Sequence, residues 1–310
     1  LWVSSVDYSA DVPIGSNILK QISDVYRKVR NTSRYLLGNL YDFDYKRDAI
    51  DITELPLLDQ WMLNRTADVI DEITYAFSNF EFSKFFQTIQ NFCVVDLSNF
   101  YLDIAKDRLY VSSKSDFRRR SCQTVLSLVI EKIAGLIAPV LCHMAEDIWQ
   151  NIPYNLEEVS VFQRGWPKTP EEWRNNSLND HVTELRKLRT VINRMLESCR
   201  NNQDLGSSLE ASVRVDICDE KVKAAIDWLS KRESNKVDVL RDWFLVSSLQ
   251  IGGEPWAEVL VSEDNDIASV DIAKARGLKC ERCWHYEVEM STNIKHPNIC
   301  NRCEKVVLAI

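Results

Sequence analysis

Glycine and proline are scarce in this sequence, with eight of each among 310 residues. Average usage would supply roughly 37 of the two together. All-β folds need these residues at their many tight turns, so the scarcity excludes an all-β protein. Hydrophobic residues make up 45% of the chain, which is enough to build buried cores. We therefore expect a folded, mostly helical protein.

A long hydrophobic run is also missing. A membrane-spanning helix needs about 18 or more consecutive apolar residues. The best candidate, residues 125–144, is interrupted by Glu131, Lys132 and His143. We expect a soluble protein that does not contact a membrane. The chain starts at Leu1, with neither an initiator methionine nor a signal peptide, so we also expect a fragment or a processed product that is not secreted.

The sequence has no excess of positive charge and no recognisable catalytic motif. Its 38 basic and 46 acidic residues leave a net charge of −8, which argues against nucleic-acid binding through bulk electrostatics. Any contact with a nucleic acid must therefore be local. The phosphate-binding G-x-x-x-x-G-K-[ST] and G-x-G-x-x-G patterns do not occur, and neither do G-x-S-x-G and H-E-x-x-H. We expect no catalytic residue in this stretch.

Four long amphipathic segments dominate the first half of the chain. Apolar residues recur with the 3.6-residue period of a helix in each of them. The last segment contains Pro139, which should kink or split it. Long helices with short connections predict an antiparallel helical bundle. The expected helices cover residues 18–40, 57–80, 83–104 and 116–149.

A second region begins after a connector rich in proline and tryptophan at residues 161–170. One more helix is expected over 182–199, and the alternation over 209–217 predicts a half-buried strand. A small α+β unit is therefore expected. Further elements are a short helix from Asp219 and strands over 244–251 and 256–262. The predicted domains are a helical bundle over 1–168, an α+β domain over 169–272 and a tail over 273–310.

The tail contains the sharpest chemical signal, two C-x₂-C pairs separated by sixteen residues: Cys280, Cys283, Cys300 and Cys303. Two such turns supply the four thiolates that a tetrahedral Zn²⁺ prefers, so we predict one structural zinc ion without a catalytic role. The alternatives are two disulfides, a redox C-x-x-C site, or replacement of one sulfur by His285 or His296. The other five cysteines are scattered singly among apolar residues, which is typical of a reducing compartment.

Three basic clusters are candidates for contact with RNA. In the tail, which carries a local net charge of +3, Arg282 could bind a phosphate and Trp284 could stack on a base, unless Trp284 packs over the zinc site as a small core. Two other clusters lie in the expected bundle. The first contains Arg27, Arg30 and Arg34, and a solvated helix face explains it as well as contact with RNA does. The second contains Arg118, Arg119 and Arg120 at the start of a helix, where positive charge opposes the helix dipole, and this favours a role in binding.

Several segments together resemble the C-terminal part of bacterial-type isoleucyl-tRNA synthetases. The segments lie at residues 1–8, 26–40, 96–110, 138–149 and 206–211. The two cysteine pairs, with Trp284 after the first, resemble the zinc motif of that family. The resemblance runs from Leu1 to about Val307 and is nearest to plant-organelle and cyanobacterial versions.

The resemblance implies an anticodon-binding bundle, a junction domain and a zinc tail that grips isoleucine tRNA. The ATP, isoleucine and editing sites would lie in upstream domains, because neither an HIGH-like nor a KMSKS-like motif occurs here. A monomer in a bacterial cytoplasm or an organelle interior is implied as well. The alternative hypothesis is a stand-alone zinc-stabilised scaffold or RNA-binding protein derived from such a synthetase.

Overall fold

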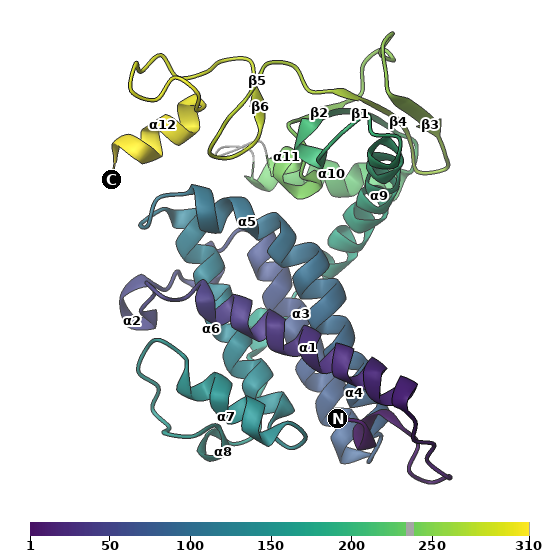
Figure 1. The fold of residues 1–310 in the computed structure, drawn as a ribbon, viewed down its shortest axis with the longest axis vertical. Helices are drawn as coiled ribbons and strands as arrows, with labels where there is room; N and C mark the ends of the chain where they lie inside the picture. The colour runs from purple at the N-terminus through teal and green to yellow at the C-terminus, as the bar shows by residue number, and fades with distance from the viewer. Residues whose placement is uncertain (234–238, 310) are drawn as a thin grey trace. The chain divides into compact units, whose positions relative to one another are not determined.

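The computed structural model describes residues 1–233 and 239–309, and the chain divides into two compact units. The first unit comprises residues 1–109 and 114–175, and the second comprises 110–113 and the chain from 176 onward. The predicted fold class, a helical bundle followed by a small α+β part and a cysteine-containing tail, is confirmed (Figure 1). The finer division at residues 168 and 272 stays a prediction.

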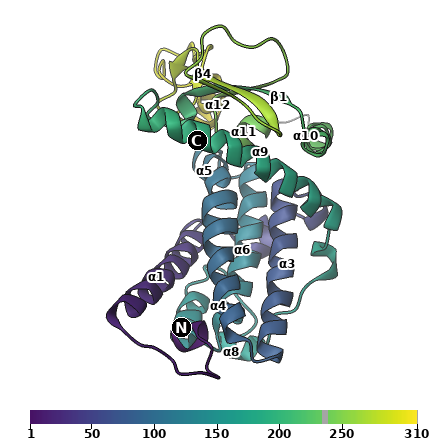
Figure 2. The same cartoon turned by 90° about the vertical axis from the view of Figure 1, so that its right-hand side faces the viewer.

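The first unit is a bundle in which α3, α4 and α6 pack side by side, and α1 crosses over them (Figures 1 and 2). Apolar side chains from most turns of α3 and α6 are buried, which places these two helices at the centre of the core. The helices are α1 (Ser16–Gly38), α2 (Tyr45–Asp48), α3 (Leu57–Ser78), α4 (Phe82–Asn91), α5 (Leu102–Val111), α6 (Phe117–Ile137), α7 (Cys142–Gln150) and α8 (Val161–Arg164). Short 3-10 turns lie at Val3–Ser5, Ile52–Glu54 and Glu171–Trp173.

Two of the predicted helices are divided in the structure. The helix expected over 116–149 is split as predicted, because α6 ends before Pro139 and α7 begins after it. The helix expected over 83–104 differs from a continuous α-helix, since α4 is followed by a π-helix over Phe92–Tyr101 before α5 begins. Periodicity alone does not detect this change, because both helix types bury the same apolar side of the segment.

A buried polar cluster lies inside the bundle. The hydroxyl of Tyr101 donates to Asp59 at 2.6 Å, and the guanidinium of Arg108 donates to the second oxygen of Asp59 at 3.2 Å. Burial raises the pKa of the Asp59 carboxyl, while the charge of Arg108 acts in the opposite direction. This cluster joins α3 to the π-helix and α5 and so fixes how these elements pack.

The second unit has a four-stranded sheet of order β2-β1-β4-β3. Three helices of the unit, α9, α10 and α11, contact its strands. Strand β1 pairs parallel with β2 and antiparallel with β4, which also pairs antiparallel with β3. The elements are α9 (Asn176–Asn201), β1 (Ala211–Ile217), α10 (Glu220–Glu233), α11 (Val239–Phe244), β2 (Ser248–Ile251), β3 (Val261–Asp264), β4 (Ala268–Lys274), β5 (Leu278–Lys279), β6 (Tyr286–Glu287) and α12 (Asn301–Leu308).

Strand alternation divides the sheet into an apolar face and a polar face. Val213 and Val215 of β1 and Val270 and Ile272 of β4 are buried on the side of α9, α10 and α11. The intervening residues face the other way. Strand β1 is found where predicted, whereas the strand expected over 256–262 begins only at Val261. Strand β4 was not predicted, although its alternating pattern is a detectable signal.

The described helices contain no stretch that combines the length and the apolar character needed to cross a bilayer.

Candidate zinc centre and nucleic-acid interface

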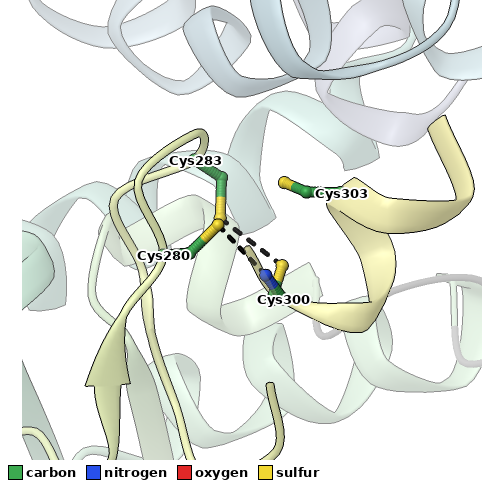
Figure 3. A group of neighbouring side chains, drawn as sticks. All are labelled: Cys280, Cys283, Cys300 and Cys303. Atoms are coloured by element: carbon green, nitrogen blue, oxygen red, sulfur yellow. Dashed lines mark hydrogen bonds between the residues drawn. The ribbon is translucent and has the colours of Figure 1, made fainter. Parts of the chain in front are cut away.

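The four cysteines of the tail come together at one point (Figure 3). Cys280 and Cys283 lie in the turn between β5 and β6, while Cys300 and Cys303 lie at the start of α12. All four are buried, and their sulfur atoms lie within 4.8 Å of one another. The sulfur atoms of Cys283 and Cys300 are 3.8 Å apart, which is about the separation in a tetrahedral zinc site with Zn–S bonds of about 2.3 Å. The cluster therefore fits a structural Zn²⁺.

The alternatives to four sulfur ligands are not supported. All nine cysteines are described and free, so the two-disulfide interpretation is wrong. The candidate metal cluster among the described residues contains neither His285 nor His296. Two C-x₂-C pairs in one closed cluster also differ from a single redox motif.

The backbone around the first cysteine pair holds the sulfurs in place. The amide of Cys280 donates to the carbonyl of His285 at 2.9 Å, and the amide of Trp284 donates back to the carbonyl of Cys280 at 2.9 Å. The hairpin that carries this turn requires a glycine at Gly277, which has a φ of +97° and where a Cβ atom would lie 2.2 Å from the carbonyl oxygen of Glu287. Local turn chemistry thus pre-positions two of the ligands.

Hydrogen-bond donors also surround the thiolates. The amide of Cys300 lies 3.3 Å from the sulfur of Cys280, and the guanidinium of Arg282 lies 3.7 Å from the sulfur of Cys303. The same guanidinium donates to the carbonyl of Val111 at 2.6 Å. Donors of this kind offset the negative charge of four thiolates around one dication. Arg282, predicted as a phosphate contact, therefore has a structural role in the tail.

Trp284 is exposed to 59% and does not form the core of the zinc site. The interpretation that it packs over the metal is therefore wrong. Apolar packing around the cysteines comes instead from Val111, Ile299, Met290 and Val307. Trp284 has a φ of +66°, a conformation that is rare for a bulky residue and that tends to occur at functional sites. Its side chain is thus largely exposed near the four-cysteine cluster.

The arginine run at the start of α6 has a structural role that the sequence does not reveal. Both terminal nitrogens of Arg119 donate to the carboxylate of Asp42, at 2.8 and 2.9 Å, and Arg119 is buried. Arg120 donates to the carbonyl of Asp42 at 3.1 Å, and half-buried Arg118 interacts electrostatically with buried Asp59. The side chain of Asp116 caps the helix and supplies negative charge at its start. The expectation that Arg119 and Arg120 are available to RNA is therefore corrected.

The cationic side chains of α1 divide into two groups. Arg27 is exposed and pairs with Asp24 one turn away. Arg30 and Arg34 are also exposed, and together with Tyr26 they line a groove of about 860 Å³ beside α7. The opposite side of the groove is formed by α7 and the residue that follows it. The sequence does not predict these lining residues, because only the tertiary fold brings α7 next to α1. They are His143, Met144, Asp147, Ile148 and Asn151.

A smaller cleft of about 350 Å³ lies along a different side of α1, against the π-helix and α5. Lys28, Asn31 and Tyr35 line it from α1, and Asn99 and Lys106 line it from the opposite elements. Helix α1 thus contributes polar and cationic side chains to two neighbouring clefts of the bundle.

The comparisons with known proteins agree with this geometry. The model for the anticodon-binding domain of tRNA ligase matches residues 59–217, and the model for the zinc finger found in FPG and IleRS matches residues 277–306. The isoleucine–tRNA ligase of Prochlorococcus marinus (strain NATL2A) is 88% identical over all 310 residues. Those of P. marinus (strain MIT 9211) and Synechococcus sp. (strain CC9311) are 66% and 64% identical over 307 residues, or 99% of the chain.

The chain spans 32% of the length of each of these relatives. The resemblance to isoleucyl-tRNA synthetases is confirmed by this similarity, and the zinc-finger match coincides with the four-cysteine cluster. The anticodon-binding match covers just over half of the residues. The chain belongs to the family of anticodon-binding domains of tRNA ligases.

Proposed function

We propose that this chain is the tRNA-binding part of an isoleucine–tRNA ligase and binds the anticodon side of isoleucine tRNA. Relatives of that name match the chain along its whole length, at 88% identity for two of them, which supports the proposal. The ATP-dependent attachment of isoleucine would take place in an upstream catalytic domain, and the editing domain would lie upstream as well. The present chain would contribute affinity and recognition without chemistry.

The observation that carries the proposal is the groove beside α1. Arg30 and Arg34 project from successive turns, and neither has an ion-pair partner among the described residues. Guanidinium groups bind phosphates through two parallel hydrogen bonds. Tyr26, exposed to 40%, offers a ring on which an unpaired base can stack. A groove with both features suits a single-stranded loop of RNA.

The zinc tail supplies the second contact in this proposal. Cys280, Cys283, Cys300 and Cys303 would hold the zinc ion, whose binding energy orders the tail. Trp284 would then stack on a base of the tRNA. Arg282 supports the metal cluster through one of its nitrogens, so its contact with a phosphate stays a prediction.

Binding of an isoleucine tRNA transcript tests the proposal. We expect Arg30→Ala combined with Arg34→Ala to weaken binding at least tenfold, because two charge-assisted phosphate contacts are removed. The slope of log affinity against log salt should fall by about one for each phosphate that is no longer bound.

Arg27→Ala is the matched control, since Arg27 lies on the same helix but lines neither cleft. We expect it to change affinity less than twofold. Equal affinities of the parent and the Arg30/Arg34 double variant would contradict a role for the groove, and a parent chain that does not bind the tRNA would contradict the proposed function.

The monomeric state and the cytoplasmic or organellar location implied by the resemblance stay predictions. The relatives named above come from cyanobacteria, which is compatible with a bacterial cytoplasm.

A further inference from the structure

We propose that the four-cysteine cluster of the tail is also a modification site, at which hydrogen peroxide oxidises Cys283 and Cys300 to a reversible disulfide. Oxidation would release the metal ion and loosen the end of α5. All nine cysteines are free in the structure, so this disulfide belongs to the oxidised state alone. The inference goes beyond the proposed function, because it concerns the chemistry of the sulfurs and every readout of its test is free of RNA.

Cys283 is the member of the cluster that solvent reaches most easily. Its exposure is 6%, against 2% for Cys300 and 0% for Cys280 and Cys303. The next residue, Trp284, is exposed, so the turn lies at the surface of the unit. A metal-bound sulfur is already a thiolate, and oxidation of cysteine follows thiolate character and access. Peroxide, which is little larger than water, therefore reacts first with Cys283.

Cys300 lies where it can complete a disulfide with the oxidised sulfur. The sulfur atoms of Cys283 and Cys300 are 3.8 Å apart, one from the turn and the other from the start of α12 (Figure 3). A disulfide bond is about 2.05 Å long, so a movement of about 1.8 Å closes it. The bond would join the two C-x₂-C turns, unlike a catalytic redox motif, whose disulfide lies within one turn.

The reaction balances with peroxide as the oxidant. The thiolate of Cys283 attacks one oxygen of hydrogen peroxide, the O–O bond breaks, a sulfenic acid forms and hydroxide leaves. The thiolate of Cys300 then attacks the sulfur of Cys283, the S–O bond breaks, the S–S bond forms and a second hydroxide leaves. The two sulfurs together lose two electrons, and both oxygens of the peroxide end as hydroxide.

Formation of the disulfide removes two of the four zinc ligands. A structural zinc site needs four donors, and Cys280 and Cys303 alone do not close the coordination shell. The binding energy of the metal orders the tail, so its loss lowers the stability of this segment. Cys303 and the rest of α12 are then no longer fixed, whereas the disulfide still tethers Cys300 to the turn.

The turn that carries Cys283 is held in a conformation that favours this opening. Trp284 has a φ of +66°, which a bulky residue keeps only while its surroundings hold it. In the reduced cluster its amide donates to the carbonyl of Cys280 at 2.9 Å, and the amide of Cys280 donates to the carbonyl of His285 at 2.9 Å. Once the cluster opens, Trp284 can return to an ordinary backbone conformation, and this favours the oxidised form.

The cluster also covers the residues at the end of α5. Val111 is 8% exposed and belongs to the same buried apolar cluster as the four cysteines. Its carbonyl accepts a hydrogen bond from Arg282 at 2.6 Å. Residues 110–113 belong to the second unit, with the tail, rather than to the bundle. Oxidation removes their cover, so these residues and the freed part of α12 become accessible together.

Zinc release from the metal-loaded chain tests the inference. Treatment with hydrogen peroxide should release one zinc ion per chain into a coloured zinc indicator, and peptide mass spectrometry after blocking of free thiols should find Cys283 joined to Cys300. Dithiothreitol and added zinc should restore the reduced cluster. Hydrogen–deuterium exchange of residues 110–113 and 303–308 should become about tenfold faster after oxidation, because local opening exposes their amides, and should return to its initial rate after reduction.

Two variants separate the cluster from the other thiols. Cys142→Ser combined with Cys218→Ser removes two exposed single cysteines and serves as the matched control, with zinc release equal to that of the parent. Cys283→His keeps four zinc ligands of types found in structural sites but lacks the attacking sulfur. We expect it to retain zinc and to release it about tenfold more slowly in peroxide. If this variant does not bind zinc, the mapped disulfide of the parent decides the question.

Three results would overturn the inference. The first is zinc that stays bound at a peroxide concentration that already oxidises exposed Cys142. The second is a disulfide within one C-x₂-C pair, Cys280 with Cys283 or Cys300 with Cys303, in place of the bond between the pairs. The third is oxidation that dithiothreitol does not reverse, because Cys283 has then passed to a sulfinic acid. None of these results bears on the binding of isoleucine tRNA, so the proposed function stands or fails separately.

Discussion

At the scale of single residues, neighbours distant in the sequence decide what an arginine does. Arg30 and Arg119 carry the same charge on helices of the same bundle, yet one lines an open groove and the other is buried against Asp42. Burial opposes the charge of Asp42, but hydrogen bonds from Arg119 and Gln123 hold the pKa of its carboxyl below the usual value. Such a pair contributes to folding rather than to binding.

We therefore expect Arg119→Met to lower the free energy of unfolding by about 3 kcal/mol, since it leaves a largely buried carboxylate without its main partner. Affinity for tRNA should not change at a temperature where the variant is folded. Arg30→Ala, which removes an exposed arginine, should instead weaken tRNA binding and leave the free energy of unfolding nearly unchanged. Chemical denaturation of the two variants gives the comparison, and loss of affinity without loss of stability in Arg119→Met would return Arg119 to the RNA interface.

The pKa shift of Asp42 sets the sign of the pH dependence. A carboxyl whose pKa is lowered in the folded state stabilises the protein above its unfolded pKa of about 3.9, and this contribution is lost as the pH falls through the folded pKa. Asp42→Asn should thus be less stable than the parent at neutral pH, and the difference should shrink in acid.

At the scale of elements, the tail depends on its metal because its secondary structure is too short to persist alone. Strands β5 and β6 have two residues each, and α12 has eight. Isolated helices shorter than about 12 residues are marginal in water. The bundle, in contrast, has its own apolar core within the first unit.

Removal of zinc by a chelator should therefore unfold residues 277–309 and leave the helices of the first unit intact. Hydrogen–deuterium exchange resolves the two regions, and Cys303→Ser should reproduce the effect without a chelator. Metal analysis of protein purified under reducing conditions should give one zinc per chain. Absence of stoichiometric zinc, or a tail that stays protected without it, would contradict the structural role.

At the scale of the whole molecule, a net charge of −8 means that affinity for RNA must come from separate local sites. The tail carries a local net charge of +3, whereas the rest of the chain is acidic. Trp284→Ala should weaken tRNA binding by about 1–3 kcal/mol, the value of one stacked base, with little change in salt slope.

Zinc must stay at one equivalent in Trp284→Ala for this result to report on stacking. Combination with the Arg30/Arg34 double variant should give nearly additive losses of binding free energy, because the residues belong to different units. Unchanged affinity in Trp284→Ala would mean that the exposed ring does not contact the tRNA.

Features that depend on short spacings can be predicted from the order of the residues alone. Two residues between Cys280 and Cys283 direct both sulfurs to one point, and 3.6-residue periodicity predicts α1, α3 and α9 from one apolar stripe each. Pro139 marks the break between α6 and α7 because its missing amide acts within one turn.

Features that depend on contacts between distant segments appear only once the chain is folded. Asp42 lies 77 positions before Arg119, and the pairing of Arg214 with Asp271 spans 57. No local pattern encodes such pairs, because chain folding brings their partners together. The groove beside α1 arises in the same way, because α7 forms its opposite side. Trp284 is exposed because Val111, Ile299 and Val307, rather than Trp284, pack around the cysteines. Spacing specifies which chemistry a segment carries, whereas packing decides whether it faces solvent.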